Sequence, residues 1–502
     1  MPVEHVDVLI VGAGISGIGA ACHLTRDCPD RSYLVLERRA RMGGTWDLFR
    51  YPGIRSDSDM FTFGYNFRPW NDTRVLADGP SIQKYVHETA AEYGVEEHIR
   101  YGIRVIKASW SSEDGRWTVE ARDEASGRKK IFTANFVMAC TGYYNYDQGY
   151  HPEFPGADEF TGTIVHPQFW PGDLDYRGKR VVVIGSGATA VTLVPAMAGD
   201  AAHVTMLQRS PSYILSLPSV DKITEGLRRV LPDDVVYGLT RRRNIVLQRA
   251  LYGLSRAQPR VMRNLILKGA ERQLRGKADL KHFNPRYQPW DQRLCVVPDG
   301  DLFRVIRRGQ ADIVTDTIER FTPTGIRLTS GTELDADIIV TATGLSLQML
   351  GGASVEVDGE PVRVHDVLTY KAVMLEGVPN AIMVFGYTNA SWTLKADLAC
   401  EYACRLLNHM AANGYTRVVA HADGAQRDTG SVLGSLNSGY VRRADDRLPR
   451  QGRRGPWRVH NDYLRDAPML RRGAIDDGVL QFSSAPRADL GTAPEATVAA
   501  RG

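Results

Sequence analysis

Cysteine is scarce in this sequence, and long apolar runs are absent. The 502 residues include six cysteines, and no two of them stand in a Cys-x-x-Cys pair. Sparse, unpaired cysteines are typical of a reducing compartment, and they indicate neither a metal site nor a redox dithiol. No stretch reaches the roughly 18–20 apolar residues that a membrane-spanning helix needs. The sequence therefore argues against a disulfide scaffold and against a helical membrane protein.

A strong charge of either sign is also missing. The net charge is +4, from 62 Lys and Arg against 58 Asp and Glu, whereas nucleic-acid binding needs a concentrated basic face. The N-terminal apolar run ends in glycines and has no basic leader, so we expect a strand there rather than a signal peptide. We therefore expect a cytoplasmic protein without a nucleic-acid partner, monomeric or homo-oligomeric. Peripheral contact with a membrane is the alternative.

What the sequence does contain is a strand–glycine–helix–strand pattern that occurs twice. The first copy consists of a β-rich run, Val6–Val11, an apolar stretch, Ile18–Leu24, and a second strand, Tyr33–Leu36. The second copy consists of the segments Arg180–Ile184, Gly185–Ala190, Val191–Ala198 and Val204–Leu207. Each copy is a βαβ unit, so the sequence predicts an α/β fold with two Rossmann-like dinucleotide-binding domains.

The first glycine-rich turn has the form G-x-G-x-x-G and includes Gly12, Gly14, Ser16 and Gly17. It follows a strand and opens a helix, which is the context that this motif requires. Gly12 permits the tight turn, Gly14 lets the backbone approach a pyrophosphate, and Gly17 lets the helix pack closely on the strand. Glu37 ends the second strand, where an acid accepts hydrogen bonds from ribose hydroxyls.

The second turn has the form G-x-G-x-x-A, and its second strand ends without an acid. The turn consists of Gly185, Ser186, Gly187, Ala188, Thr189 and Ala190. Arg209 and Ser210 follow the second strand, and an arginine there suits a 2′-phosphate that an acid would repel. This site is predicted to bind NADPH. The first site, with the opposite ribose chemistry, is predicted to bind FAD, and hydride would pass from NADPH to the flavin.

These assignments predict domain limits. We expect an FAD-binding domain at 1–147 and 347–485 and an NADPH-binding domain at 148–217 and 287–346, with short strands at Ala311–Thr315, Ile326–Leu328 and Ile338–Thr341. Residues 218–286 would form a helical insertion that mixes apolar and basic residues. We favour an ordinary solvated insertion, compatible with a cap over the substrate cleft, over a membrane-surface helix. Small residues and prolines from Ser483 onward predict a disordered tail at 486–502.

A linker motif narrows the chemistry. Residues 160–171, FTGTIVHPQFWP, include Phe160, Gly162, His166 and Trp170. They resemble the Baeyer–Villiger monooxygenase fingerprint F-x-G-x-x-x-H-x-x-x-W-P. In that family His166 would couple the two domains rather than act as a base. Without the family, a structural histidine and a core tryptophan would be the simpler interpretation.

Two further segments resemble the same family. Residues 43–57 match its G-G-x-W…Y-P-G-x-x-x-D motif, and the resemblance places Gly44, Thr45, Trp46 and Asp57 along the flavin. Arg55, in the same segment, is a further candidate for cofactor binding. In YQPWDQRLCVVP (287–298) the family implies that Arg293 is the catalytic arginine, and Gln292 stands where many relatives have lysine. The family also implies an adenine-side contact at Val105.

From about residue 5 to 482 the sequence resembles the EthA-type branch of FAD-containing monooxygenases. This resemblance implies that NADPH and O2 are used to insert oxygen next to a ketone carbonyl through a C4a-peroxyflavin, giving an ester or lactone. It also implies oxygenation of thioethers or thioamides. Arg293 would stabilise the peroxyanion electrostatically, and Asp57 would orient Arg293.

Other classes of protein share parts of this pattern. A sulfur- or nitrogen-oxygenating flavin monooxygenase is the main alternative, although an N-hydroxylating enzyme gives no reason for Arg293 or the fingerprint. A pyridine-nucleotide disulfide reductase has two similar nucleotide folds but needs a redox cysteine pair, which the six cysteines do not offer. A non-catalytic flavoprotein would have no reason to keep the motifs intact.

Overall fold

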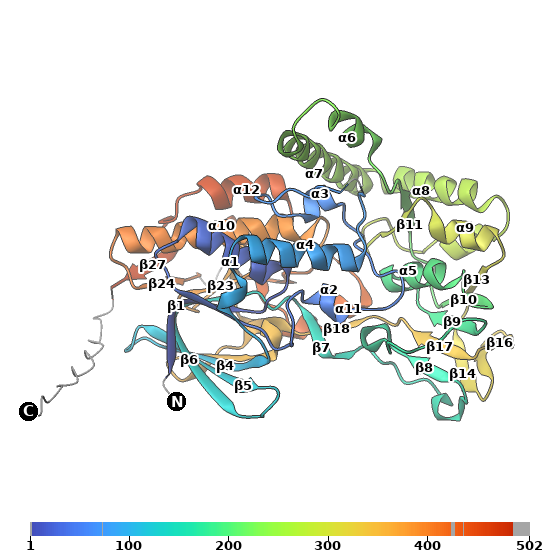
Figure 1. Ribbon diagram of the computed structural model, residues 1–502, viewed down its shortest axis with the longest axis horizontal. Helices are drawn as coiled ribbons and strands as arrows, with labels where there is room; N and C mark the ends of the chain where they lie inside the picture. Colours follow the sequence, from blue (N-terminus) through green and yellow to red (C-terminus); the bar gives the residue numbers. More distant parts are fainter. Residues whose placement is uncertain (1–2, 73, 423–426, 435, 485–502) are drawn as a thin grey trace, which may run out of the picture.

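Two β-sheets lie side by side, and helices cover them (Figure 1). The computed structural model describes residues 3–484 apart from 73, 423–426 and 435. The predicted disordered tail, 486–502, lies outside the described residues. Ser483, where the tail composition begins, instead belongs to strand β27 (Leu480–Ser483), which pairs with β24 (Arg417–Ala420).

The first sheet combines a parallel centre with an antiparallel extension. The parallel strands are β1 (Glu4–Val11), β2 (Tyr33–Leu36), β3 (Ile99–Arg100), the C-terminal half of β6 (Lys129–Ala139) and β23 (Ala381–Met383). The extension consists of β4 (Ile103–Ser111), β5 (Arg116–Asp123), β19 (Ser354–Val357) and β20 (Glu360–Pro361), and all its pairings are antiparallel except that of β19 with β4, which is parallel. Strand β2 is buried throughout, as expected where helices or strands cover both faces of a parallel sheet.

The second sheet is parallel and has the order β13-β10-β9-β17-β8 among the described strands. Its members are β8 (Thr163–Val165), β9 (Arg180–Ile184), β10 (His203–Gln208), β13 (Ala311–Thr315) and β17 (Ile338–Thr341). A small antiparallel sheet of β14 (Ile318–Thr322), β15 (Gly325–Leu328) and β16 (Glu333–Asp335) packs beside it. Strands β7 (Tyr144–Gly149) and β18 (Leu345–Leu347) pair where the chain passes between the two sheets.

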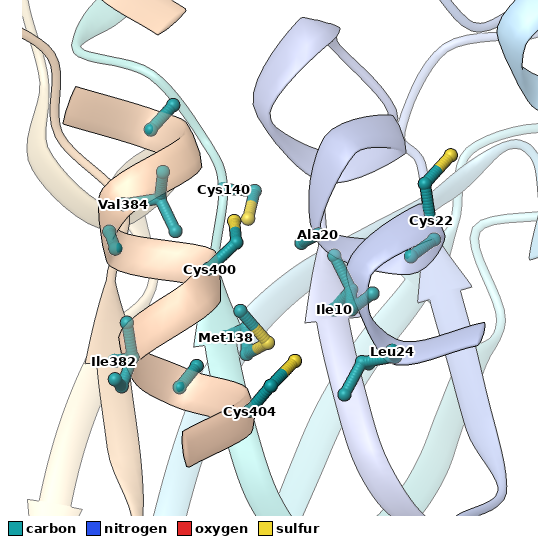
Figure 2. Packing of buried hydrophobic residues seen from close by; sticks show 14 of the residues in the cluster. Ile10, Ala20, Cys22, Leu24, Met138, Cys140, Ile382, Val384, Cys400 and Cys404 are labelled. Atoms are coloured by element: carbon teal, nitrogen blue, oxygen red, sulfur yellow. The ribbon is translucent and has the colours of Figure 1, made fainter. Parts of the chain in front are cut away.

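Two long helices cover the first sheet. Helix α1 (Ile15–Asp27) is buried from Ile15 to Leu24 and packs against α10 (Trp392–Ala412). Figure 2 shows Ala20 and Leu24 of α1 with Cys400 and Cys404 of α10, packed around Ile10 and Met138 from the sheet. Further helices on this part are α4 (Gly79–Glu92), α12 (Tyr463–Arg472) and the short α2 (Thr45–Leu48), α3 (Met60–Phe63) and α11 (Gly439–Arg442).

The second sheet and the insertion have their own helices. Helices α5 (Ala188–Met197) and α9 (Asp301–Arg307) pack by the second sheet. The insertion forms three helices with breaks between them: α6 (Lys222–Leu227), α7 (Asp233–Ala257) and α8 (Pro259–Leu274). None of the helices in the described part of the chain is long and apolar enough to cross a membrane.

A buried carboxylate joins three parts of the chain. Asp397 on α10 lies 3.6 Å from His23 Nε2 on α1 and 3.4 Å from Arg241 Nη2 on α7, and its Oδ2 also accepts the Asn66 N–H at 2.9 Å. Burial alone would lower the pKa of His23, but hydrogen bonds to Asp27 and Asp397 outweigh burial and raise it from 6.5 to about 9. The charged imidazolium therefore stabilises the folded state.

This raised pKa predicts a pH-dependent stability. Because the folded-state pKa of His23 lies above its ordinary value, the contribution is fully present below pH 6.5 and is lost as the pH rises towards 9. The free energy of unfolding should fall by about 3 kcal/mol over this range. We expect His23→Gln to remove most of that slope in denaturant titrations and His421→Gln, on an exposed histidine, to keep it. Equal slopes for the wild type and His23→Gln would contradict the assignment.

Candidate active site

A cavity of about 860 Å³ lies between the two sheets and is lined by both glycine-rich turns. Residues from both predicted nucleotide folds therefore face one space. The predicted site residues that line it are Gly12, Gly14, Ser16, Glu37, Gly44, Thr45, Trp46, Arg55, Asp57, Val105, Gly185, Ser186, Gly187, Ala188, Thr189, Arg209, Ser210 and Arg293. Gly17 and Ala190 do not line the cavity, because each lies behind its turn on the side of the helix that packs on the sheet.

The first turn needs its glycines for different reasons. Gly12 has φ +101°, and a Cβ there would lie 2.8 Å from the Cys140 carbonyl oxygen. A Cβ on Gly17 would lie 1.8 Å from the Gly12 carbonyl oxygen. A Cβ on Gly14 would meet only the Gly44 Cα at 3.5 Å and that residue's nitrogen at 3.9 Å. Gly12 and Gly17 are thus required by the fold itself, whereas Gly14 presents bare backbone to the cavity.

Glu37 is buried at the end of β2 with its carboxylate held by two backbone groups. One oxygen accepts the Ala13 N–H at 2.7 Å, and the other accepts the Arg39 N–H at 2.8 Å. Burial raises the pKa of Glu37 against these hydrogen bonds. The carboxylate is fixed at the wall of the cavity, where each oxygen still has a lone pair to offer.

The second turn repeats this arrangement. Gly185 has φ +147°, and a Cβ there would lie 2.4 Å from the Ala342 carbonyl oxygen. Gly187 has ordinary backbone angles, and no protein atom lies within 4 Å of the position of a Cβ. Helix α5 begins directly after Gly187, so its first N–H groups and the positive end of its dipole face the open space above this glycine.

Arg209 and Ser210 are exposed at the end of β10, on the rim of the cavity. Among the described residues no carboxylate lies within ion-pairing distance of Arg209. Its guanidinium is therefore available to an anion, unlike that of Arg38, which binds Asp147 at 2.6 Å near the first turn.

An ion pair connects the two halves of the cavity. Arg293 Nε lies 2.8 Å from Asp57 Oδ2, and its Nη2 donates to Asp57 Oδ1 at 2.9 Å. The negative charge of Asp57 raises the pKa of Arg293 above its ordinary value, so the guanidinium stays protonated. About a third of the Arg293 side chain, 34%, stays accessible, so the guanidinium is both oriented and open to the cavity. The structure thus brings together two residues that are 236 positions apart.

Three tyrosines beside this pair were not predicted as site residues. Tyr143, Tyr144 and Tyr440 line the cavity, and the Tyr143 ring stacks on Trp392 at 5.2 Å. Burial raises the pKa of each tyrosine, that of Tyr144 to about 12, so all three phenols stay protonated at neutral pH. Nothing in the spacing of residues around Tyr143 assigns this segment to the site.

Arg55 also forms an ion pair across the two halves of the molecule, but here the first half supplies the positive charge. Its Nη1 lies 2.6 Å from Asp301 Oδ2 at the start of α9, and both side chains are largely buried. Arg55 and Asp57 lie in one segment of the first half, and each binds an oppositely charged residue of the second half. Arg55 was predicted to bind a cofactor, and the structure adds this pairing to its place on the cavity wall.

The fingerprint residues lie outside the cavity lining, on and around the second sheet. Phe160 is buried with Phe321, and a Cβ on Gly162 would lie 2.4 Å from the Asp337 carbonyl oxygen. Trp170 packs on the core of the second sheet. His166 packs so closely on Gly149 of β7 that a Cβ there would lie 2.1 Å from its ring. Burial, together with His151, lowers the pKa of His166 to about 4, so its ring is neutral.

The cysteines bear on the disulfide reductase alternative. All six are buried and free in the described structure. Cys140 and Cys295 line the cavity, one from each half, but neither is bonded to another cysteine. Burial raises the pKa of both thiols, which makes them poor nucleophiles. The described residues thus give this alternative no redox pair.

Comparison with known proteins identifies the family. The chain matches the family model described as flavin-binding monooxygenase-like over residues 5–410, and it belongs to this family. The putative FAD-containing monooxygenase MymA of Mycobacterium tuberculosis is 58% identical over 96% of this chain and 98% of the relative. The FAD-containing monooxygenase EthA of the same organism is 55% identical over 96% of this chain and 99% of the relative.

The fold comparison agrees with this result. An oxidized steroid monooxygenase bound to NADP matches with a TM-score of 0.74 over 95% of this chain and 99% of that chain, at 23% identity. The predicted resemblance to EthA-type monooxygenases and the predicted α/β fold with two dinucleotide-binding domains are therefore confirmed.

The Arg55–Asp301 pair can be tested by exchanging its charges. Arg55→Asp alone leaves two acids facing each other in a largely buried place, and we expect it to lower the free energy of unfolding by about 3 kcal/mol. The double variant Arg55→Asp/Asp301→Arg should recover at least about half of this loss in denaturant titrations. Arg177→Asp, on an exposed arginine beside the second sheet, is the control and should change stability little. A double variant no more stable than Arg55→Asp would show that the pair does not hold the two halves together.

Proposed function

We propose that this chain is an NADPH- and O2-dependent FAD monooxygenase that inserts oxygen next to a ketone carbonyl, the Baeyer–Villiger reaction. The observation that carries the proposal is the Asp57–Arg293 pair, which presents an oriented, permanently charged guanidinium to a cavity lined by two nucleotide-binding turns. We assign residues 1–147 and 347–485 to the FAD-binding domain, 148–217 and 287–346 to the NADPH-binding domain, and 218–286 to the insertion.

The first half of the cavity fits FAD. Gly14 and Gly44 approach each other at a bare stretch of backbone at the start of α1, where a pyrophosphate has room and N–H donors. The fixed Glu37 carboxylate suits ribose hydroxyls, and Val105 lies further along the same wall. Thr45, Trp46 and Asp57 continue the lining towards the second half.

The second half fits NADPH. A side chain on Gly187 would enter the open space at the start of α5, so this glycine leaves room for a phosphate rather than for a protein neighbour. Arg209 and Ser210 on the rim supply a charge and a hydroxyl for a 2′-phosphate. Gln292 carries no charge, so Arg209 bears most of this recognition.

Bound FAD, reduced by hydride from NADPH, supplies the activation of O2. Arg293 stabilises the negative charge that develops on oxygen during attack on a carbonyl, and it does so without giving up its proton. Asp57 holds two of the nitrogens of Arg293 and thereby fixes the direction in which the remaining donors point. Trp392 and the stacked Tyr143 give this part of the cavity an apolar wall for the substrate's hydrocarbon part.

One observation favours sulfur oxygenation as a second candidate. A thioether or thioamide attacks the peroxide as a nucleophile, so the peroxide has to be protonated or hydrogen-bonded to act as the electrophile. Tyr143, Tyr144 and Tyr440 stand near Arg293 with protons that burial keeps in place. These phenols supply hydrogen-bond donors that a reaction needing only a peroxyanion would not require.

One assay tests the proposed function. The purified protein, loaded with FAD, is given NADPH in air with a ketone or with a thioether, and oxygen uptake and products are followed. An ester or lactone supports the main proposal, and sulfoxide alone supports the second candidate. NADPH oxidation that yields only hydrogen peroxide with every substrate of both kinds would contradict both.

Removing Arg209 should weaken NADPH binding selectively. Arg209→Ala deletes the charge assigned to the 2′-phosphate, and we expect KM for NADPH to rise about 10- to 100-fold with little change for NADH. Arg177→Ala, on an exposed arginine beside the same sheet, is the matched control and should leave both values unchanged. An equal effect of Arg209→Ala on the two nucleotides would refute this assignment.

Removing Arg293 should separate flavin reduction from oxygen transfer. In Arg293→Ala we expect anaerobic bleaching of the flavin by NADPH to remain measurable, while ester formation falls at least about 100-fold because the developing oxyanion loses its partner. Asp57→Asn should give a smaller loss, since the guanidinium is then present but less well oriented. A normal ester yield from Arg293→Ala would remove Arg293 from the mechanism.

A further inference from the structure

The helical insertion contains most of the exposed large hydrophobic residues of the described chain. Residues 222–275 are about a ninth of the chain, yet they contain 11 of its 18 exposed large hydrophobic residues. The most exposed is Val230, at 77%. The 11 are Ile223, Val230, Leu231, Val235, Leu239, Val246, Leu247, Leu251, Leu254, Val261 and Leu265. Single exposed aliphatic residues are common on proteins, but a concentration of this kind marks an interaction surface.

These residues follow the helical repeat. On α7 the exposed Val235, Leu239 and Val246 are spaced by four and seven positions and form one row along the helix. The exposed Leu247, Leu251 and Leu254 are spaced by four and three positions and form a second row, and the two rows together make a broad aliphatic stripe. On α8 the exposed Val261 and Leu265, four positions apart, begin a further stripe, which Lys268 and Arg272 continue after steps of three and four positions. Figure 1 shows α6, α7 and α8 together at the upper edge of the molecule, outside both sheets.

Positive charge accompanies the aliphatic stripe. From 222 to 275 the sequence has 13 Lys and Arg against four Asp and Glu, whereas the whole chain has a net charge of only +4. Arg242, Arg249 and Arg256 are seven residues apart and flank the stripe of α7. Arg249 and Arg256 reach Asp462 and Asp291 but remain about half exposed, at 50% and 51%.

We propose that α6, α7 and α8 form a docking surface for a lipid bilayer with anionic headgroups. A helix with one aliphatic face and arginines beside it lies in the plane of a membrane, with the aliphatic side chains among the acyl chains and the arginines at the phosphates. The ordinary solvated insertion expected from the sequence does not account for 11 exposed aliphatic residues between positions 222 and 275.

The chemistry of the surface favours a bilayer over a second copy of the chain. Protein–protein interfaces are depleted of charge at their centre and enriched in aromatic residues. Here the exposed large hydrophobic residues of the insertion are all Ile, Val or Leu, and basic side chains run beside them. The local excess of nine positive charges would repel the same surface of a second copy, whereas it attracts an anionic headgroup layer.

The insertion is also held firmly enough to present this surface. Arg241, on the buried side of α7, donates to the carbonyl oxygens of Phe61 and Gly64 at 2.9 and 2.7 Å and pairs with Asp397. Tyr237 donates to the Tyr65 carbonyl oxygen at 2.8 Å. No residue of 222–275 lines the cavity described above, so substitutions on the outer face leave the proposed cofactor sites intact.

The test is vesicle flotation of the full-length, FAD-loaded protein. We expect it to float with phosphatidylcholine vesicles containing about one third phosphatidylglycerol and to stay behind with pure phosphatidylcholine, since the surface charge supplies part of the attraction. Raising the salt from about 0.1 to about 0.5 M should release most of the bound protein.

Two sets of variants separate the aliphatic from the basic contribution. The first set, Leu239→Ser/Val246→Ser/Leu254→Ser, should lower the partition coefficient at least about tenfold, because three aliphatic side chains no longer enter the bilayer. The second set, Arg242→Glu/Lys268→Glu/Arg272→Glu, should also lower it at least about tenfold, because each lost charge alone counts for roughly fivefold. The matched controls are Ile106→Ser/Ile131→Ser, on exposed aliphatic residues of the first sheet, and Lys84→Glu on α4. These controls should float as the wild type does. Flavin content and NADPH oxidation should be unchanged throughout, which separates this test from that of the proposed function.

Two outcomes would overturn the proposal. One is a wild-type protein that does not float with either kind of vesicle. The other is a wild-type dimer in sedimentation velocity without lipid that the aliphatic variant converts to a monomer, which would assign the surface to a second copy of the chain.

Discussion

The ion pair between Asp57 and Arg293 depends on the whole arrangement of the molecule, because its two members belong to different halves. Asp57 follows the first glycine-rich turn, and Arg293 precedes β12 (Cys295–Pro298) beside the second sheet. A guanidinium and a carboxylate that form two parallel hydrogen bonds tolerate little displacement. The cavity and the oriented guanidinium in it therefore exist only while the two sheets keep their present relative position.

Several contacts maintain that relative position, and each is of a different kind. Arg55 and Asp301 form a second ion pair with reversed polarity. The linker strands β7 and β18 pair where the chain passes between the halves. His166 packs on Gly149 of β7 as a neutral ring, since burial lowers its pKa to about 4. This histidine of the fingerprint thus contacts the linker strand through the shape of its ring. The coupling role that the family resemblance implies for it stays a prediction.

The elements near each glycine-rich turn could be predicted because their signals are local. Strands β2, β9, β13 and β17 have the bounds expected from runs of β-branched and aliphatic residues, and Gly12 and Gly185 have the positive φ angles that tight turns require. Helix α5 begins at Ala188 rather than Val191, since the turn passes directly into the helix. Arg293 and Asp57 were reached only through resemblance. The partners of Arg55 and Arg241 could not be predicted, because Asp301 and Asp397 are 246 and 156 positions away and no periodic pattern links them.

The position of β23 in the first sheet affects how the chain folds during its synthesis. This strand comes from residues 381–383 and pairs with β6, whose C-terminal half has β1 on its other side. During synthesis the N-terminal βαβ unit emerges long before β23, and the entire second sheet and the insertion emerge in between. Strand β5 pairs with the N-terminal part of β6, but residues 137–139 of β6 lack a partner on that side until β23 emerges. An unpaired strand edge invites association with other chains. The first half of the protein is therefore the first to start folding and among the last to finish.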